Sequence, residues 1–295
     1  MTHTQASKLH QILNQEYTAS EAVHHPRTKI ITVSSGKGGV GKSTLTANMA
    51  HQLSQMGYKV GVFDADIGLA NLDIIFNVRV EKTLLHVLRG EATLQDIVLD
   101  VAPNLLLIPG ESGDEIFAYN NDEIMMRFAA EAAILDDLDF LLIDTGAGIG
   151  KNVQIFLKEA DEIIVVTMPD PSAITDAYAL IKVTNTFHSD INMVLNMTRN
   201  EKEGKLIFDK IKKVADNNIS NPPELTYLGN ISQDPVITKS SKFRVLFNEE
   251  YPNNLCSYEL STITRRLLEK MEHNVLLPPQ RNSFAIFIKR VLDHF

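Results

Sequence analysis

Eight consecutive residues, Gly36 to Ser43, have the types and spacing that bind a chain of phosphates. They read GKGGVGKS, in the frame Gly-x-x-x-x-Gly-Lys-Ser, where glycines let backbone N–H groups turn inward around phosphate oxygens. Lys42 is expected to reach the β- and γ-phosphates, and the Ser43 hydroxyl to hold Mg²⁺. Lys37 is unusual, because a second lysine in such a loop needs a further negative group to meet its charge. The residues expected to contact the nucleotide are Gly36, Gly38, Gly39, Val40, Gly41, Lys42, Ser43 and Thr44.

Two acidic motifs supply the remaining chemistry of nucleotide hydrolysis. Asp64 and Asp66 follow one apolar run in the motif DADIG, and Asp144 follows another in DTGAG. Ligands of an open parallel sheet collect at the carboxyl ends of its strands, so all three motifs can converge on one γ-phosphate. Asp144 is placed to hold Mg²⁺ through water, and Asp66 or Asp64 to orient the attacking water. A single aspartate after a strand is more often a cap or turn residue, but three motifs in this order favour a hydrolytic site.

These motifs must be positioned by a sheet that is buried on both faces. Seven apolar runs alternate with helical stretches, which predicts a single α/β P-loop NTPase domain with a mostly parallel twisted sheet and helices on both faces. The expected strands are Lys29–Val33, Lys59–Phe63, Asn104–Ile108, Phe140–Ile143, Glu162–Met168, Asn192–Asn196 and Thr226–Gly229. The expected helices include Thr44–Leu53, Asp122–Leu135, Ser172–Phe187 and Glu201–Asp216.

Composition restricts the class of protein. The chain has 295 residues, of which 44% are hydrophobic and 22% charged, in the ordinary globular range. Its formal net charge of −9 argues against broad electrostatic binding of nucleic acid. With one cysteine, Cys256, an internal disulfide and a cysteine-built zinc or iron–sulfur site within one chain are excluded. No secretory signal and no apolar stretch of ~20 residues is found, so a soluble cytoplasmic protein is expected.

Taken together, the three motifs resemble the deviant Walker A loop, switch I and switch II of the MinD/ParA ATPases. The similarity extends from Asp64 to Asp73, read as DADIGLANLD, and over about residues 28–271 as a whole. Within that family the chain resembles the FlhG group (also called YlxH or FleN), which regulates flagellar number and placement, in Asp144–Ile149, the N-terminal extension and the tail. The resemblance implies a flexible extension over residues 1–28, a MinD-like ATPase domain over 29–272, a linker over 273–282 and a terminal helix over 283–295.

For the site, the resemblance implies slow, Mg²⁺-dependent hydrolysis of ATP by a homodimer that forms when ATP is bound. Lys37 would cross to the partner subunit's phosphates, Lys42 would act within its own subunit, and Asp66 would orient the lytic water. Ser43, Asp64 and Asp144 match the positions around Mg²⁺. Asn196 matches an adenine-contacting asparagine, although the Asn-Arg pair typical of the family is split here by two residues before Arg199. Asn196 can equally cap the turn that follows it.

The last helix carries one apolar stripe at helical spacing, with charged residues off it. Its members are Phe284, Phe287, Ile288, Val291, Leu292 and Phe295. One interpretation is an interfacial helix that binds an anionic membrane surface, as the resemblance to MinD and FlhG tails implies, which would place the ATP-bound protein at the inner face of the cell membrane. The other is a helix that packs on its own domain.

At the opposite end, Gln5, Ala6 and Leu9 are similar to a short FlhG segment that stimulates the GTPase FlhF, with Thr4 and His10 in place of its acidic and basic ends. An unstructured leader is the alternative. The resemblance also implies binding to flagellar basal-body (C-ring) proteins and no specific binding of nucleic acid.

Other classes within the superfamily make different demands on the sequence. A cell-division MinD lacks the N-terminal extension, and a nucleoid-binding ParA needs a basic surface that this acidic chain does not suggest. Iron–sulfur carriers need paired cysteine ligands, which the single Cys256 cannot supply. Amide-forming ligases need a pocket for a small acid, and no motif identifies one. The flagellar switch ATPase is therefore the leading interpretation, with MinD as the alternative.

Overall fold

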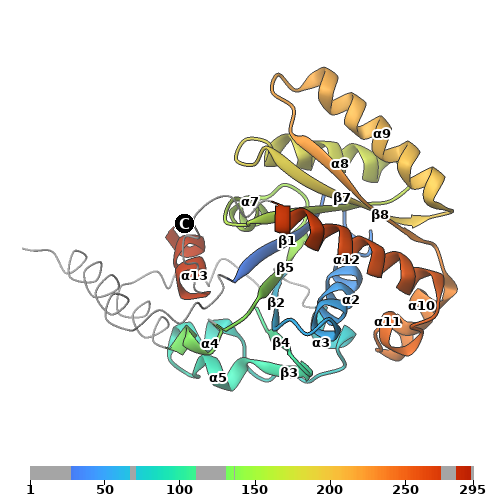
Figure 1. The fold of residues 1–295 in the computed structure, drawn as a ribbon. Helices are drawn as coiled ribbons and strands as arrows, with labels where there is room; N and C mark the ends of the chain where they lie inside the picture. Colours follow the sequence, from blue (N-terminus) through green and yellow to red (C-terminus); the bar gives the residue numbers. More distant parts are fainter. Residues whose placement is uncertain (1–27, 67–70, 111–130, 136, 274–283, 294–295) are drawn as a thin grey trace, which may run out of the picture.

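A central sheet with helices on both faces organises the computed structural model, which describes residues 28–66, 71–110, 131–135, 137–273 and 284–293 (Figure 1). Eight strands of this part join in the order β3-β4-β2-β5-β1-β6-β7-β8. All neighbours are parallel except β3 and β4, which run antiparallel at one edge. The strands are β1 Lys29–Ser35, β2 Val60–Ala65, β3 Leu99–Ala102, β4 Leu105–Ile108, β5 Phe140–Ala147, β6 Glu162–Thr167, β7 Asp190–Thr198 and β8 Glu224–Ser232. The predicted α/β class is confirmed.

Two layers of helices cover the sheet because its strands are apolar on both faces. One core cluster joins one strand face to α2, α3 and α10–α12, and two others join the opposite face to α4, α5, α7–α9 and α13. Within β5 the alternation is visible, since Phe140 and Leu142 face the first layer while Leu141 and Ile143 face the second. The helices are α2 Lys42–Gln55, α3 Leu72–Ile75, α4 Leu84–Arg89, α5 Leu94–Ile97, α7 Lys151–Lys158, α8 Pro171–Thr184, α9 Glu201–Asn218, α10 Pro235–Phe243, α11 Phe247–Glu250, α12 Leu255–His273 and α13 Phe284–Asp293.

The structure contains all seven strands expected from the sequence, with differences at their ends. It also contains one strand that was not expected. Strand β5 continues four residues beyond the predicted Ile143, and β7 and β8 are longer than predicted at both ends. The missed strand is β3, a four-residue edge strand whose side chains are at most partly buried and whose apolar run is interrupted by Asp100. Of the helix expected over Asp122–Leu135, the described end is a 3-10 helix, η2 Ala132–Leu135.

Strands β2, β5 and β1 are parallel neighbours in the sheet. The three motifs at their carboxyl ends therefore lie next to one another. Asp64 on β2 and Asp144 on β5 are direct partners in the strand register. Strand β1 pairs with β5 up to Val33 and again at Ser35, with a shift of register between them. The phosphate-binding loop, which connects β1 to α2, therefore begins beside the end of β5.

The C-terminal helix α13 lies against the domain, and its apolar stripe faces the protein. Phe284, Phe287, Ile288, Val291 and Leu292 are each at most 3% exposed. The ring of Phe287 lies 6.3 Å from Phe156 of α7, and that of Phe284 lies 6.2 Å from Phe63 of β2. Of the two interpretations that the stripe allowed, packing on its own domain is the arrangement in this structure. Phe295 lies outside the described residues, and none of the described helices is both long and apolar enough to cross a bilayer.

Candidate nucleotide site

The start of α2 is built to receive an anion. Gly41 occupies the N-cap position with φ of 86°, a left-handed conformation that favours glycine, and no side chain caps the helix. The first turn contains no acidic residue, so its free N–H groups and positive dipole end have no negative partner within it. A Cβ on Gly38 or Gly39 would meet no atom within 4 Å, so the loop has open space beside it. At Gly36, by contrast, a Cβ would lie 2.2 Å from the backbone of Asp176, so α8 packs directly against the loop.

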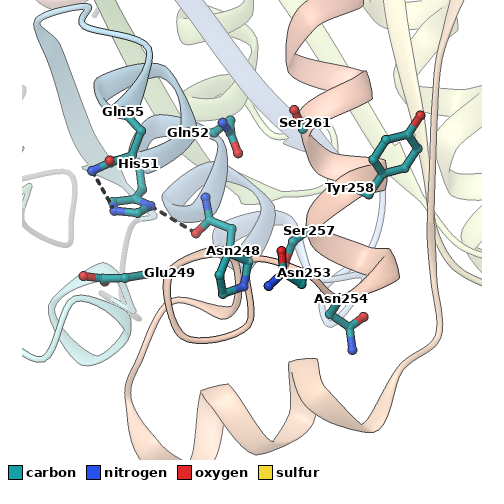
Figure 2. A pocket seen from close by; sticks show the side chains of 11 residues that line it. His51, Gln52, Gln55, Asn248, Glu249, Asn253, Asn254, Ser257, Tyr258 and Ser261 are labelled. Atoms are coloured by element: carbon teal, nitrogen blue, oxygen red, sulfur yellow. Dashed lines mark hydrogen bonds between the residues drawn. The ribbon is translucent and has the colours of Figure 1, made fainter.

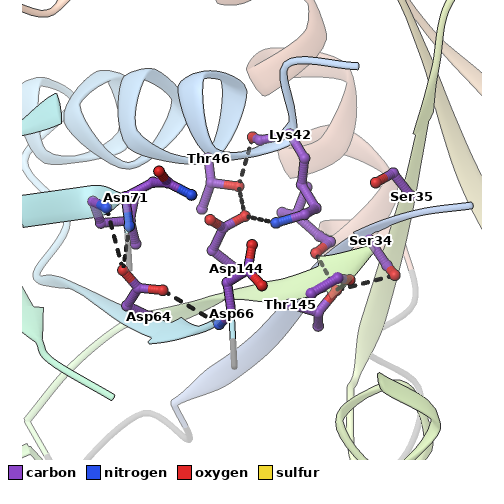
Figure 3. A network of polar contacts seen from close by, with 12 residues as sticks. Ser34, Ser35, Lys42, Thr46, Asp64, Asp66, Asn71, Asp144 and Thr145 are labelled. Carbon is purple, nitrogen blue, oxygen red and sulfur yellow. Dashed lines mark hydrogen bonds and ion pairs between the residues drawn. The ribbon is translucent and has the colours of Figure 1, made fainter. Parts of the chain in front are cut away.

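Lys42 and Asp144 form a buried ion pair at the centre of the site (Figure 3). The Lys42 ammonium donates to Asp144 Oδ1 at 2.7 Å, and Thr46 Oγ1 donates to the same oxygen at 3.3 Å. The other carboxylate oxygen, Oδ2, is buried without a hydrogen-bond partner in the described part of the chain. A buried charged oxygen without a partner is costly, so this atom is suited to a cation or an ordered water.

Asp64 lies beside this pair and anchors the start of switch I. It is 4% exposed, its Oδ2 accepts hydrogen bonds from the backbone N–H groups of Asn71 and Leu72, and its Oδ1 accepts from that of Asp66. Burial and then the neighbouring Asp144 raise the pKa of Asp64 to about 6, against the lowering effect of the three N–H donors. Asp64 therefore links the strand position next to Asp144 to the loop that holds Asp66, a connection that the motif alone did not reveal.

Asp66 is half-buried at the entrance of the site. A Cβ on Gly146 would lie 3.2 Å from Asp66 Oδ1, so the carboxylate rests directly against the glycine of switch II. Burial raises the pKa of Asp66, the positive charge of Lys42 lowers it, and Asp144 raises it. The two switch motifs predicted to converge are thus in contact.

Switch II is also tied to the phosphate-binding loop. Thr145 Oγ1 lies 3.2 Å from Val33 O and 3.1 Å from Ser34 Oγ, and the backbone N–H of Gly148 donates to Ser35 O at 2.8 Å (Figure 3). A displacement of the switch II backbone would therefore act on the residues that precede the loop. Such a connection is what a phosphate-sensing switch requires.

Lys37 contacts Asp170 and Ser172, a pairing that the sequence analysis did not predict. Its ammonium lies 3.3 Å from Asp170 Oδ1 and also donates to Ser172 Oγ, and its side chain is 41% exposed. Asp170 caps α8 by accepting from Ala173 N at 2.9 Å. Hydrogen bonds from Ser172 and Ala173, followed by Lys37, lower the pKa of Asp170 to about 2. The signal was present in the sequence as Asp-Pro-Ser after a strand, an ordinary helix start, but its contact with Lys37 spans 133 residues.

Asn196 lies beside the loop and stabilises its backbone. Its Nδ2 donates to Val40 O at 2.8 Å, and its Oδ1 accepts from Met197 N at 2.9 Å. A Cβ on Gly41 would lie 2.2 Å from this Nδ2. Asn196 thus forms the local turn contact that the sequence left open, and contact with adenine stays a prediction. Gln5, Ala6 and Leu9 lie outside the described residues.

The arrangement fits a triphosphate with Mg²⁺. The uncapped helix start and Lys42 suit phosphate, and the unpartnered Asp144 oxygen suits the metal or its water. The described residues contain no cluster of three or more His, Cys, Asp or Glu groups poised as a metal cage. Mg²⁺ in P-loop sites is held largely by phosphate, hydroxyl and water oxygens, and Ser43 stays the predicted hydroxyl ligand. Mg²⁺ would supply charge neutralisation at the γ-phosphate.

Comparison with known proteins identifies the class. A family model described as "ParA: NUBPL iron-transfer P-loop NTPase" matches residues 27–268, and the chain belongs to this family of ParA P-loop NTPases.

Among individual relatives, the chain is 43% identical to the flagellum site-determining protein YlxH of Helicobacter pylori, over 99% of each chain. It is 32% identical to the antiactivator FleN of Pseudomonas aeruginosa, over 92% of this chain and 95% of that one. A solved structure of the septum site-determining protein MinD with Mg-ADP, from Pyrococcus horikoshii, superposes with a TM-score of 0.66 at 25% identity, over 85% of this chain and 100% of that one. The resemblance to this family and to its flagellar group is confirmed.

Proposed function

We propose that this protein is an ATP-driven dimerising switch that controls flagellar number or placement through reversible membrane association and partner binding. The proposal rests on the different surroundings of the two lysines in the phosphate-binding loop. Lys42 is 6% exposed and already faces the carboxylates of its own site, whereas the Lys37 ammonium lies at the surface on Asp170. A surface cation next to a phosphate loop is positioned to leave its subunit and reach the triphosphate of a second copy.

Hydrolysis then uses the groups that the sheet brings together. Lys42 would exchange Asp144 for the β- and γ-phosphates, and Asp144 Oδ2, which has no hydrogen-bond partner among the described residues, would help to hold the Mg²⁺ hydration shell. Asp66, at the entrance of the site and against Gly146, orients the attacking water. Preorganised charge of this kind is the main catalytic contribution in phosphoryl transfer. When the γ-phosphate leaves, the links between switch II, Ser34 and Ser35 would transmit the change to the loop that carries Lys37.

Membrane association requires α13 to leave its groove. Burial of five apolar side chains contributes about 1.5–3 kcal/mol each, or about 8–15 kcal/mol in total. Fixing the backbone of the ten residues of α13 costs about 1–2 kcal/mol each, or about 10–20 kcal/mol. The cost of ordering therefore offsets much of the gain from burial, so reversible docking of α13 is possible. Once released, the same stripe can enter an anionic bilayer surface, and two copies on one dimer bind more firmly than one.

The partners follow from the flagellar relatives and from the N-terminal residues. The YlxH and FleN matches cover 99% and 92% of this chain, which supports a flagellar role for it. We propose that Gln5, Ala6 and Leu9 bind the GTPase FlhF and that basal-body proteins of the C-ring receive the dimer. Deletion of residues 1–20 is expected to remove stimulation of FlhF and to leave ATP hydrolysis intact.

The direct test is the molecular mass in solution with ADP and with ATP, by light scattering coupled to gel filtration. Asp66→Ala should form a dimer with ATP and a monomer with ADP, because phosphate binding survives while hydrolysis falls about 10²–10⁴-fold. Lys37→Ala should remain a monomer with either nucleotide while still binding ATP. An Asp66→Ala protein that is monomeric at saturating ATP would refute the switch.

A further inference from the structure

Three carboxylates lie at the nucleotide site, and hydrogen bonds fix two of them (Figure 3). Asp144 accepts from Lys42 at 2.7 Å and from Thr46 at 3.3 Å. Asp64 accepts from three backbone N–H groups at the start of switch I. The carboxylate of Asp66, in contrast, accepts no hydrogen bond from any of the described residues. Within this part of the chain, its position is therefore decided by packing.

The lysine side of the site is anchored by the far part of α2. Further along this helix, His51 Nδ1 lies 3.2 Å from Asn248 Oδ1 of α11 (Figure 2). The amide of Asn248 also donates to Asn48 O of α2 at 3.0 Å, and all three side chains are buried. The helix that begins with Lys42 is thus tied to α11, so the ion pair of Lys42 with Asp144 has a fixed place. Asp66 is the carboxylate that neighbouring atoms can displace.

The strand register places Gly146 beside Asp66. Strands β2 and β5 pair up to Ala65 and Thr145, and Asp66 and Gly146 come next in the two chains. Side chains two residues apart in a strand lie on the same face of the sheet. A side chain at position 146 would therefore lie on the face that carries Asp144, directly next to Asp66.

A side chain at this position would be confined on both sides. A Cβ on Gly146 would lie 3.2 Å from Asp66 Oδ1 and 3.9 Å from Val153 Cγ2. Val153 of α7 is 6% exposed and belongs to a packed core cluster, so it has little room to move. The half-buried Asp66 would have to give way, by a few tenths of an ångström. Glycine at this position thus lets the carboxylate rest against the backbone of switch II.

We infer that Gly146 is a positioning residue for hydrolysis: the absence of a side chain there lets the Asp66 carboxylate take the place from which it orients the attacking water. This role of Gly146 rests on the role proposed above for Asp66, and it requires neither dimerisation nor membrane association. Groups in a catalytic site must be held within about 0.5 Å of the productive geometry, and a misplacement of about 1 Å can cost about 10²-fold in rate. A displacement of a few tenths of an ångström should therefore lower kcat about tenfold.

The test compares Gly146→Ala with Gly150→Ala in the full-length protein, with kcat and KM obtained from phosphate release with Mg-ATP. Gly150 is the matched control, because it has an ordinary φ of −61° and a Cβ on it would meet no atom within 4 Å. Gly146 has no positive φ either, so neither alanine is strained by its backbone. Gly146→Ala should lower kcat about tenfold and leave KM within about twofold of the wild type, whereas Gly150→Ala should match the wild type in both.

A double variant separates the positioning of Asp66 from a general effect on the fold. In Asp66→Ala there is no carboxylate to displace, so the addition of Gly146→Ala should not lower the rate further. Single-turnover release of radiolabelled phosphate measures these slow rates. If the two substitutions act independently, the double variant will be about tenfold slower than Asp66→Ala.

The positioning role is overturned if Gly146→Ala retains the wild-type kcat, or if the loss appears in KM or in ATP binding instead. It is also overturned if Gly150→Ala shows the same loss, or if the two effects multiply in the double variant. A wild-type rate in Asp66→Ala would show that the proposed role of Asp66 is itself wrong, and the role of Gly146 with it. A slow Asp66→Ala with an unaffected Gly146→Ala would leave the role of Asp66 standing and reject that of Gly146 alone.

Discussion

Replacement of Phe156 by alanine separates the docking of the α13 stripe on its own domain from the membrane binding that we propose for it. Phe156 belongs to α7 and is 6% exposed, and its ring lies 6.3 Å from Phe287 of α13 and 6.0 Å from Phe63 of β2. The substitution removes part of the docking groove and leaves every residue of α13 in place. Undocking therefore becomes easier, while the capacity of the helix to enter a bilayer is unchanged.

The size of the effect follows from the contact that is lost. One aromatic pair contributes about 0.5–1.5 kcal/mol beyond the area it buries. A loss of about 1.4 kcal/mol from the docked state raises the undocked population about tenfold. Because the proposed reversible docking requires a small net free energy, a change of this size is enough to alter the observed state.

Sedimentation with anionic liposomes measures the outcome. With ADP, the wild type should bind weakly and Phe156→Ala should bind about tenfold more strongly, close to the wild type with ATP. Phe208→Ala is the matched control, since Phe208 is a 3% exposed phenylalanine of α9 in a core cluster that does not include α13. Both variants lose core packing of similar size, about 3–5 kcal/mol. If Phe156→Ala folds but binds liposomes with ADP as weakly as the wild type, or if Phe208→Ala shows the same gain, the reasoning is wrong.

Two further predictions concern the nucleotide site. Asp170→Asn keeps the cap of α8 but removes the negative charge that holds Lys37. The variant should therefore dimerise with ATP at about two- to fivefold lower protein concentration than the wild type, as measured by sedimentation equilibrium. An unchanged concentration at half-dimerisation would show that the contact does not restrain Lys37. The raised pKa of Asp64, about 6 against an ordinary 3.8, means that the folded protein retains a proton that the unfolded chain has released. The stability from this group is present below about pH 4 and is lost as the pH rises through 6, a difference of about 3 kcal/mol. Asp64→Asn keeps an acceptor oxygen and cannot ionise, so urea unfolding at pH 4.5 and pH 7 should give free energies of unfolding whose difference shifts by up to that amount; an identical pH dependence in the variant would contradict the shifted pKa.

Much of the fold could be predicted from the sequence, because the patterns that determine it are local and recur along the chain. Continuous apolar runs predicted the buried parallel strands, and the helical stretches between them predicted the layers on both faces. Strand β3 was missed because a short edge strand has one partner and only partly buried side chains, so its composition does not distinguish it clearly from a loop. The carboxyl ends of β5 and β7 were misjudged because buried polar residues such as Asp144, Thr145 and Thr198 continue those strands beyond the apolar runs that marked them.

The sequence alone determined the phosphate loop, the two acidic motifs and their order along the chain. Each of these depends on neighbouring residues whose spacing fixes the backbone, so reading them requires no knowledge of distant contacts. Only the tertiary structure decided that Lys37 rests on Asp170, that Asn196 supports Val40 and that the stripe of α13 packs against Phe156. The physical reason is that a charge or an apolar face specifies what kind of partner it needs but not which one. The hydrophobic effect in particular is non-directional, and a groove of the same domain satisfies it as well as a membrane does.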